Sequence, residues 1–221
     1  MRRVLIVDDQ DPAFAGELET EIRDESGNAP ELMHINPSDF FSDGRTPDQT
    51  LAKLLARVAE AATEFWDVII IDLYLGDFGF DGHRNLEVCL RVAEAAREAN
   101  RSATMLLYSG TLSKYVNELL GGGASDTQLR RIFHAEVANF VQRSRIAREV
   151  RSAVDNPTWL LRVDRLLMTT PALVVGPEEA EFVGRTFAEL AKLVRRQNDE
   201  GQKITQLAVD YGVAAFTDLN S

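Results

Sequence analysis

Five side chains able to do chemistry each stand directly after a stretch that predicts a β-strand. Asp8, Asp9 and Asp72 are carboxylates, Ser109 carries a hydroxyl and Arg143 is a fixed cation. Carboxylates gathered at neighbouring strand ends repel one another, by about 4 kcal/mol for two charges ~4 Å apart at an effective dielectric of about 20. A site that keeps them ionised favours a hard divalent cation, and Mg²⁺ suits one or two carboxylates together with waters and a phosphate.

An aspartate held beside such an ion predicts phosphoryl transfer. A carboxylate can attack phosphorus and form an aspartyl phosphate, and the ion neutralises the charge that builds on the transferred group. The hydroxyl of Ser109 and the cation of Arg143 are in position to hold the phosphate oxygens.

The elements that must position these residues alternate between strand and helix. Short apolar, β-branched runs predict strands, and apolar residues at helical spacing predict the helices between them. This alternation predicts a doubly wound parallel sheet with helices on both faces, whose site lies off the carboxyl ends of the strands. The predicted strands are 3–7, 31–35, 67–73, 103–108 and 138–142, and the predicted helices are 12–24, 47–64, 83–99, 112–120, 126–137 and 144–154.

Composition favours a cytoplasmic protein with a real core. Apolar residues make up 45% of the 221-residue chain, and no apolar run is long enough to cross a bilayer. The single Cys89 cannot form an internal disulfide, and its helical setting indicates core packing. The net charge of −11 lies mostly in the first 144 residues, which makes that part a poor nucleic-acid surface.

The ordered set of strand-end motifs resembles the receiver domains of bacterial response regulators. Residues 3–9 (RVLIVDD) resemble the first strand and its acidic pair, and residues 68–73 (VIIIDL) resemble the third strand with its phosphoacceptor. Asp81-Gly82 resembles the aspartate-glycine that follows. Residues 106–110 (LLYSG) resemble the fourth strand with its hydroxyl residue, and residues 140–144 (FVQRS) the fifth strand with its aromatic switch residue. The resemblance covers roughly residues 2–154.

The resemblance implies a flavodoxin-like sheet of order 2-1-3-4-5 and a role in two-component signalling. Asp72 would take the phosphoryl group from a sensor histidine kinase or a phosphotransfer protein, and Ser109 and Phe140 would then move together as a switch. No enzymatic activity beyond slow autodephosphorylation is implied. The implied ligands of Mg²⁺ are Asp8, Asp9, Asp72 and the backbone carbonyl of Tyr74.

The sequence departs from the family at three places. Arg143 stands where the family has lysine, which keeps the charge but not the compact ammonium. Gly76 replaces the usual proline after the acceptor strand, and a helix at 126–137 is added near the face that receivers use to signal. Lys114 lies early in a predicted helix and is not expected to substitute. A receiver that binds its partner without phosphorylation is therefore the alternative.

Each candidate also has a purely structural interpretation. The acidic pair could simply end a strand, and Asp72 could cap a helix. Ser109 before a glycine is an ordinary turn residue, Arg143 could form a surface salt bridge, and Phe140 could be core filler.

Residues 155–221 predict a helical output or dimerisation segment. Helices are expected at 157–170, at 177–197 and from Ile204 onward, and Gly201 is expected to separate the second helix from the third. A stripe on the second of these helices predicts packing on a twin chain or on the receiver itself, and a downstream protein is a further expected partner. The members of the stripe are Phe182, Phe187, Leu190 and Val194.

Two other functions have weaker support. Residues 207–213 are spaced like the start of a helix-turn-helix, but the recognition helix would be short and would carry no Lys or Arg, so nucleic acid is not the expected partner. An aspartate-dependent phosphohydrolase would need a second carboxylate two residues after Asp72, where this chain has Tyr74.

Overall fold

The protein contains a five-stranded, all-parallel sheet whose order is β2-β1-β3-β4-β5. The strands are β1 (Arg3–Val7), β2 (Glu31–Ile35), β3 (Val68–Asp72), β4 (Thr104–Ser109) and β5 (Val137–Gln142). The computed structural model describes residues 2–9, 12–23, 28–41, 45–76, 85–112, 126–158, 161–162, 182 and 184–207. This order confirms the predicted doubly wound fold, and strand bounds differ from the expected ones by at most a residue or two.

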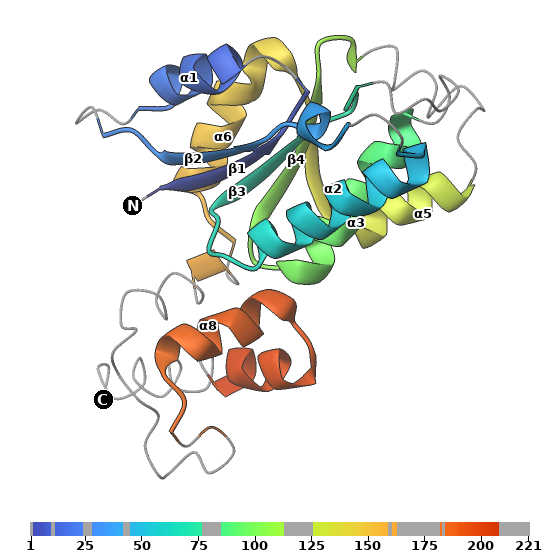
Figure 1. Ribbon diagram of the computed structural model, residues 1–221. Helices are drawn as coiled ribbons and strands as arrows, with labels where there is room; N and C mark the ends of the chain where they lie inside the picture. The colour runs from blue at the N-terminus through green and yellow to red at the C-terminus, as the bar shows by residue number, and fades with distance from the viewer. Residues whose placement is uncertain are drawn as a thin grey trace.

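Helices cover both faces of the sheet (Figure 1). One face carries α1 (Pro12–Glu21) and α6 (Ile146–Asp155). The other carries α2 (Pro47–Ala62), α3 (Asn85–Ala99) and α5 (Asp126–His134). Burial of both faces explains why β3 is an unbroken apolar run rather than an alternating one.

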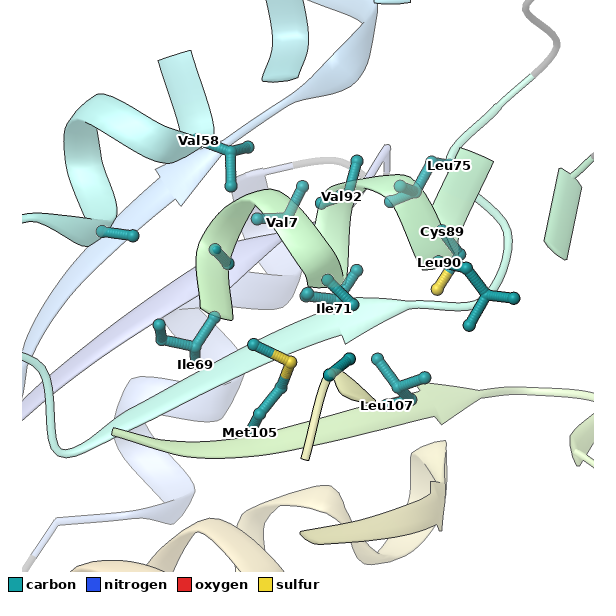
Figure 2. Close-up of a cluster of buried hydrophobic side chains, with 14 of the residues drawn as sticks. Val7, Val58, Ile69, Ile71, Leu75, Cys89, Leu90, Val92, Met105 and Leu107 are labelled. Atoms are coloured by element: carbon teal, nitrogen blue, oxygen red, sulfur yellow. The ribbon is translucent and has the colours of Figure 1, made fainter. Parts of the chain in front are cut away.

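Alternate residues of each strand enter two separate cores. Leu5, Ile69 and Met105 pack with α2 and α3, as Figure 2 shows for Ile69, Met105 and their neighbours. Val4 and Ile70 pack instead with α1 and α6. Cys89 is fully buried in the first core, and burial raises the pKa of its thiol, so its interpretation as core packing is confirmed.

Helix starts follow local capping chemistry. The Thr46 side chain accepts from the Gln49 backbone, the Gln49 side chain accepts from the Thr46 N–H, and Pro47 stands at the first turn, which fixes the start of α2. Pro37–Phe40 forms the short 3-10 helix η1, whose cap Asn36 accepts from the Ser38 N–H. A second one, η3 (Arg143–Arg145), joins β5 directly to α6.

The C-terminal helices differ from the predicted ones. A helix was expected from residue 177, but α8 spans Phe187–Arg196 and is capped by Thr186. Gly184, with φ +81°, precedes this cap, and its left-handed backbone is incompatible with a continuing helix. Gly201 does not interrupt a helix as expected, because residues 199–207 are helical. The break falls at Gln197, which caps α8 with φ 47°.

Gly201 allows the two C-terminal helices to approach closely. A Cβ at this position would overlap the Leu193 carbonyl oxygen of α8. The approach buries Phe182, Leu190, Val194 and Ile204 together in a small third core.

The C-terminal unit (residues 182 and 184–207) lies against the α/β part of the chain at the end of the sheet where the strands begin, below the sheet in Figure 1. Arg195 of α8 is buried, and its Nη1 donates to the Thr63 carbonyl at 2.8 Å. Its guanidinium lies 5.8 Å from the Phe65 ring, and the Arg101 N–H donates to its backbone carbonyl.

Several predicted features lie outside the described residues. These are most of the helix at 112–120 with Lys114, the Asp81-Gly82 pair, most of the helix at 157–170, the side chain of Phe187 and the helix-turn-helix spacing beyond Leu207. Within the described residues, no helix combines the length and the apolar character that crossing a bilayer requires.

Candidate functional site

Three carboxylates from two neighbouring strands meet at the carboxyl end of the sheet. Asp8 and Asp9 follow β1, and Asp72 is the last residue of β3. One oxygen from each lies within 4.8 Å of the others. Asp8 and Asp72 are buried and Asp9 is half-buried. The spatial convergence expected from the strand ends is therefore present.

The pKa of the Asp72 carboxyl is raised well above its ordinary value. Burial, and then the charges of Asp8 and Asp9, raise this pKa from 3.8 to about 7. The backbone N–H of Tyr74 opposes this by donating to Oδ1 at 2.9 Å, and the positive charge of Arg143 opposes it further. A cation bound here would replace the repulsion among the three carboxylates with attraction.

Asp8 has a partner that the sequence did not indicate. The hydroxyl of Tyr108 on β4 donates to Oδ2 of Asp8, and both side chains are fully buried. The Tyr108 ring stacks on Phe14 of α1 with centroids 5.7 Å apart. Burial, followed by the charge of Asp8, raises the pKa of the Tyr108 phenol, so the hydroxyl stays a donor.

Arg143 lies at the site but rests on an aromatic ring. Its guanidinium carbon is 4.3 Å from the centroid of Phe14, within the range of a cation–π contact. Its charge still lowers the pKa of Asp72. The structure thus places Arg143 on Phe14 of α1, near enough to Asp72 for its charge to act on that carboxyl.

Ser109 and Phe140 lie on the same face of the sheet. Phe140 pairs in register with Leu107, and Ser109 follows Leu107 by two positions, so their side chains project from one face. Ser109 is buried, and its hydroxyl oxygen accepts from the Thr111 N–H at 3.1 Å. Phe140 is half-buried against the core of α2 and α3.

Gly76 lies beside Asp9 at the edge of the site. Its φ is +90°, and a Cβ there would lie 3.3 Å from Oδ2 of Asp9. Proline, whose φ is fixed near −65°, could not adopt this backbone. The departure from the family at this position therefore has a local structural reason.

The residues present fit a magnesium ion. The donor set is all oxygen, two of its carboxylates are buried, and Gly76 leaves open the space beside Asp9 that a side chain would fill. Mg²⁺ prefers such oxygen ligands and keeps several waters. When bound, it would supply positive charge to a phosphoryl group arriving at Asp72.

Sequence reasoning missed Tyr108 and Phe14 as parts of the site. Tyr108 sits in an apolar strand and Phe14 in a helical stripe, and both patterns are typical of core residues. The usable signal in the sequence was that Tyr108 immediately precedes the strand-end Ser109. The structure then places Tyr108 in register with Asp72.

The sheet order and the strand-end carboxylates define the class: a flavodoxin-like doubly wound α/β protein with the fold of receiver domains. No protein-family model matches the chain, and no curated protein matches it. Among solved structures, the chain is similar to the signal receiver domain of the response regulator NarL from Mycobacterium tuberculosis, at 18% identity and a TM-score of 0.34, covering 69% of this chain and 92% of that one.

It is also similar to RcsB from Salmonella enterica serovar Typhimurium, whose structure was determined bound to the promoter rprA in the presence of phosphomimetic beryllofluoride. The identity is 14%, the TM-score is 0.35, and 99% of each chain is covered. The fold assignment rests on the sheet order itself, and the chemistry on the geometry of the site.

Proposed function

We propose that the chain is a response regulator that accepts a phosphoryl group on Asp72 in a Mg²⁺-dependent reaction and signals through a protein–protein interface. The observation that carries this proposal is the meeting of Asp8, Asp9 and Asp72, with oxygens within 4.8 Å, at the carboxyl end of a parallel sheet. Sites of open α/β sheets lie at this end.

The chain's own residues would each have a part in the transfer. Asp8, Asp9, Asp72 and the Tyr74 carbonyl would hold the ion. The Tyr74 N–H on Oδ1 fixes the rotation of the Asp72 carboxylate. An oxygen of this carboxylate would attack phosphorus as the bond from phosphorus to the donor's histidine nitrogen breaks. Ser109 and Arg143 would hold the oxygens of the transferred group, and Ser109 and Phe140, on one face of the sheet, would change position together.

The output of such a switch would involve the C-terminal unit. Arg195 docks this unit at the opposite end of the sheet from the acidic site, so a change at Asp72 would have to pass through the receiver to reach it. A homodimer through these helices stays a prediction. It would use surfaces other than the stripe, because Leu190 and Val194 are already buried with Ile204 of the same chain.

One observation favours the alternative of a receiver that binds its partner without phosphorylation. Arg143 is engaged by the Phe14 ring at 4.3 Å, so its guanidinium would have to leave or share this contact to hold a phosphate. If Arg143 stays on Phe14, the fold can serve as a binding module whose state does not depend on phosphate.

Incubation with Mg²⁺ and a small phosphodonor, followed by intact mass measurement, separates the two. Wild type should gain the mass of one phosphoryl group, and Asp72→Asn or excess EDTA should abolish the gain. Beryllofluoride with size-exclusion chromatography then tests whether the modified state changes assembly. A wild type that behaves like Asp72→Asn would leave only the binding module.

A further inference from the structure

Tyr108 joins the acidic site to the core beneath it. Its ring is fully buried on β4, in register with Asp72 of β3. Its hydroxyl donates to Oδ2 of Asp8, which follows β1, the strand on the other side of β3. The side chain therefore reaches across the central strand β3, from β4 to the carboxylate that follows β1.

Contacts on a third side hold the tyrosine ring in place. Phe14 of α1 stacks on it at an interplanar angle of 20°, and the guanidinium of Arg143 lies over Phe14. The order in space is Arg143, Phe14, Tyr108 and Asp8. Because each member is packed against the next, the position of the hydroxyl is set by α1, β4 and the segment after β5 together.

We propose that Tyr108 is a positioning residue for the cation site, acting through Asp8: its hydroxyl fixes the Asp8 carboxylate in the orientation that Mg²⁺ needs. This inference rests on the proposed function, since it assumes that Asp8 is a ligand. Groups that hydrogen-bond to metal ligands fix the ligands' orientation, and their loss commonly costs 10- to 100-fold in affinity.

A phenylalanine ring would meet the packing needs of this position but would not supply the hydrogen bond that the hydroxyl donates to Asp8. Tyr108 packs in an apolar core of Val4, Ile70 and Val141, where a phenyl ring fills almost the same volume. The presence of a hydroxyl at this position is explained by its hydrogen bond to Asp8. A tyrosine that only filled space would affect stability when altered, but not the affinity of the site for a cation.

The test uses the full-length Tyr108→Phe variant, which keeps the ring and its stacking on Phe14. Mn²⁺ binding is followed by the electron paramagnetic resonance of the free ion, and Mg²⁺ binding by competition. We expect the affinity for both ions to fall about 10-fold or more. The matched control is Val68→Ala, which removes buried volume from the same core at the far end of β3. It should lower stability to urea and leave cation affinity unchanged.

A double variant shows whether the effect passes through Asp8. Asp8→Asn alone should weaken binding, and Asp8→Asn combined with Tyr108→Phe should be no weaker than Asp8→Asn alone. Additive losses would mean that Tyr108 acts by another route and would overturn the inference.

The remaining outcomes are equally decisive. Unchanged or tighter binding in Tyr108→Phe, or an equal loss in Val68→Ala, overturns the positioning role while leaving the proposed function intact. If wild type binds neither ion, the proposed function fails first, and the role of Tyr108 fails with it.

Discussion

The guanidinium carbon of Arg143 lies 4.3 Å from the centre of the Phe14 ring. The residue at this position in receivers is a lysine by the resemblance, and a compact ammonium could not cover an aromatic face in the same way. Arg143 is thus the residue whose substitution best separates a phosphorylated receiver from a binding module.

If the proposed function holds, Arg143→Gln should slow phosphorylation by a small phosphodonor by about tenfold or more, because the site would lose the cation proposed to hold the phosphoryl oxygens. Arg143→Lys keeps the charge and should lose much less. Both rates are measured by intact mass against time at saturating Mg²⁺. Equal rates in wild type and Arg143→Gln would show that the guanidinium stays on Phe14 throughout the reaction.

Gly76→Ala should weaken cation binding and destabilise the fold. Its φ of +90° strains any side chain, and the added Cβ would lie 3.3 Å from Oδ2 of Asp9, so we expect a loss of roughly 1–2 kcal/mol in the free energy of unfolding. The matched control is Gly110→Ala, because Gly110 also follows a strand but its Cβ would meet nothing within 4 Å. Urea unfolding and Mn²⁺ titration measure the two effects. Identical behaviour of the two variants would contradict this account of Gly76.

Asp72 should make metal-free wild type less stable as the pH rises. Its pKa is raised from 3.8 to about 7 in the folded protein, so between these values the folded state binds more protons than the unfolded state. The stabilisation is present below about pH 4 and is lost as the pH passes through 7, by at most about 4 kcal/mol.

Asp72→Asn removes this dependence, because the amide is neutral at every pH. In EDTA the variant should be more stable than wild type at pH 8, and the difference should shrink towards pH 4. Mg²⁺ should then stabilise wild type more than the variant. A difference between the two proteins that does not change with pH would show that the carboxyl of Asp72 titrates normally.

Arg195→Met should loosen the C-terminal unit. Arg195 is buried and donates to the Thr63 carbonyl at 2.8 Å, and a lost buried hydrogen bond from a charged group costs about 1–3 kcal/mol. Arg196→Met alters the exposed neighbour on the same helix and should change the free energy of unfolding by less than about 0.5 kcal/mol. Urea unfolding gives both values, and equal losses would place Arg195 outside any specific contact.

The sequence predicted the receiver fold and the meeting of the three carboxylates because both follow from short-range patterns. Apolar runs ending in aspartate mark strand ends, and parallel strands place these ends at one rim. Arg195 escaped prediction because an arginine on an amphipathic helix usually faces solvent, and its burial depends on a contact with Thr63, far away in the chain.

The predicted start of α8 and the predicted helix break at Gly201 were wrong for the same physical reason. Glycine commonly ends helices, but Gly201 lies inside one because the backbone of Leu193 approaches it. Gly184 is the glycine that precedes a helix start. Which glycine ends a helix and which permits close approach is decided by tertiary contacts that spacing alone does not contain.

The proposed function depends most directly on phosphorylation of Asp72 itself. After reaction with Mg²⁺ and a phosphodonor, borohydride reduction converts an aspartyl phosphate to homoserine, and peptide mass spectrometry locates the change. We predict homoserine at position 72, with none in protein treated in EDTA. Homoserine at Asp8 or Asp9 instead, or no homoserine at all under conditions where Mg²⁺ is bound, would contradict the account.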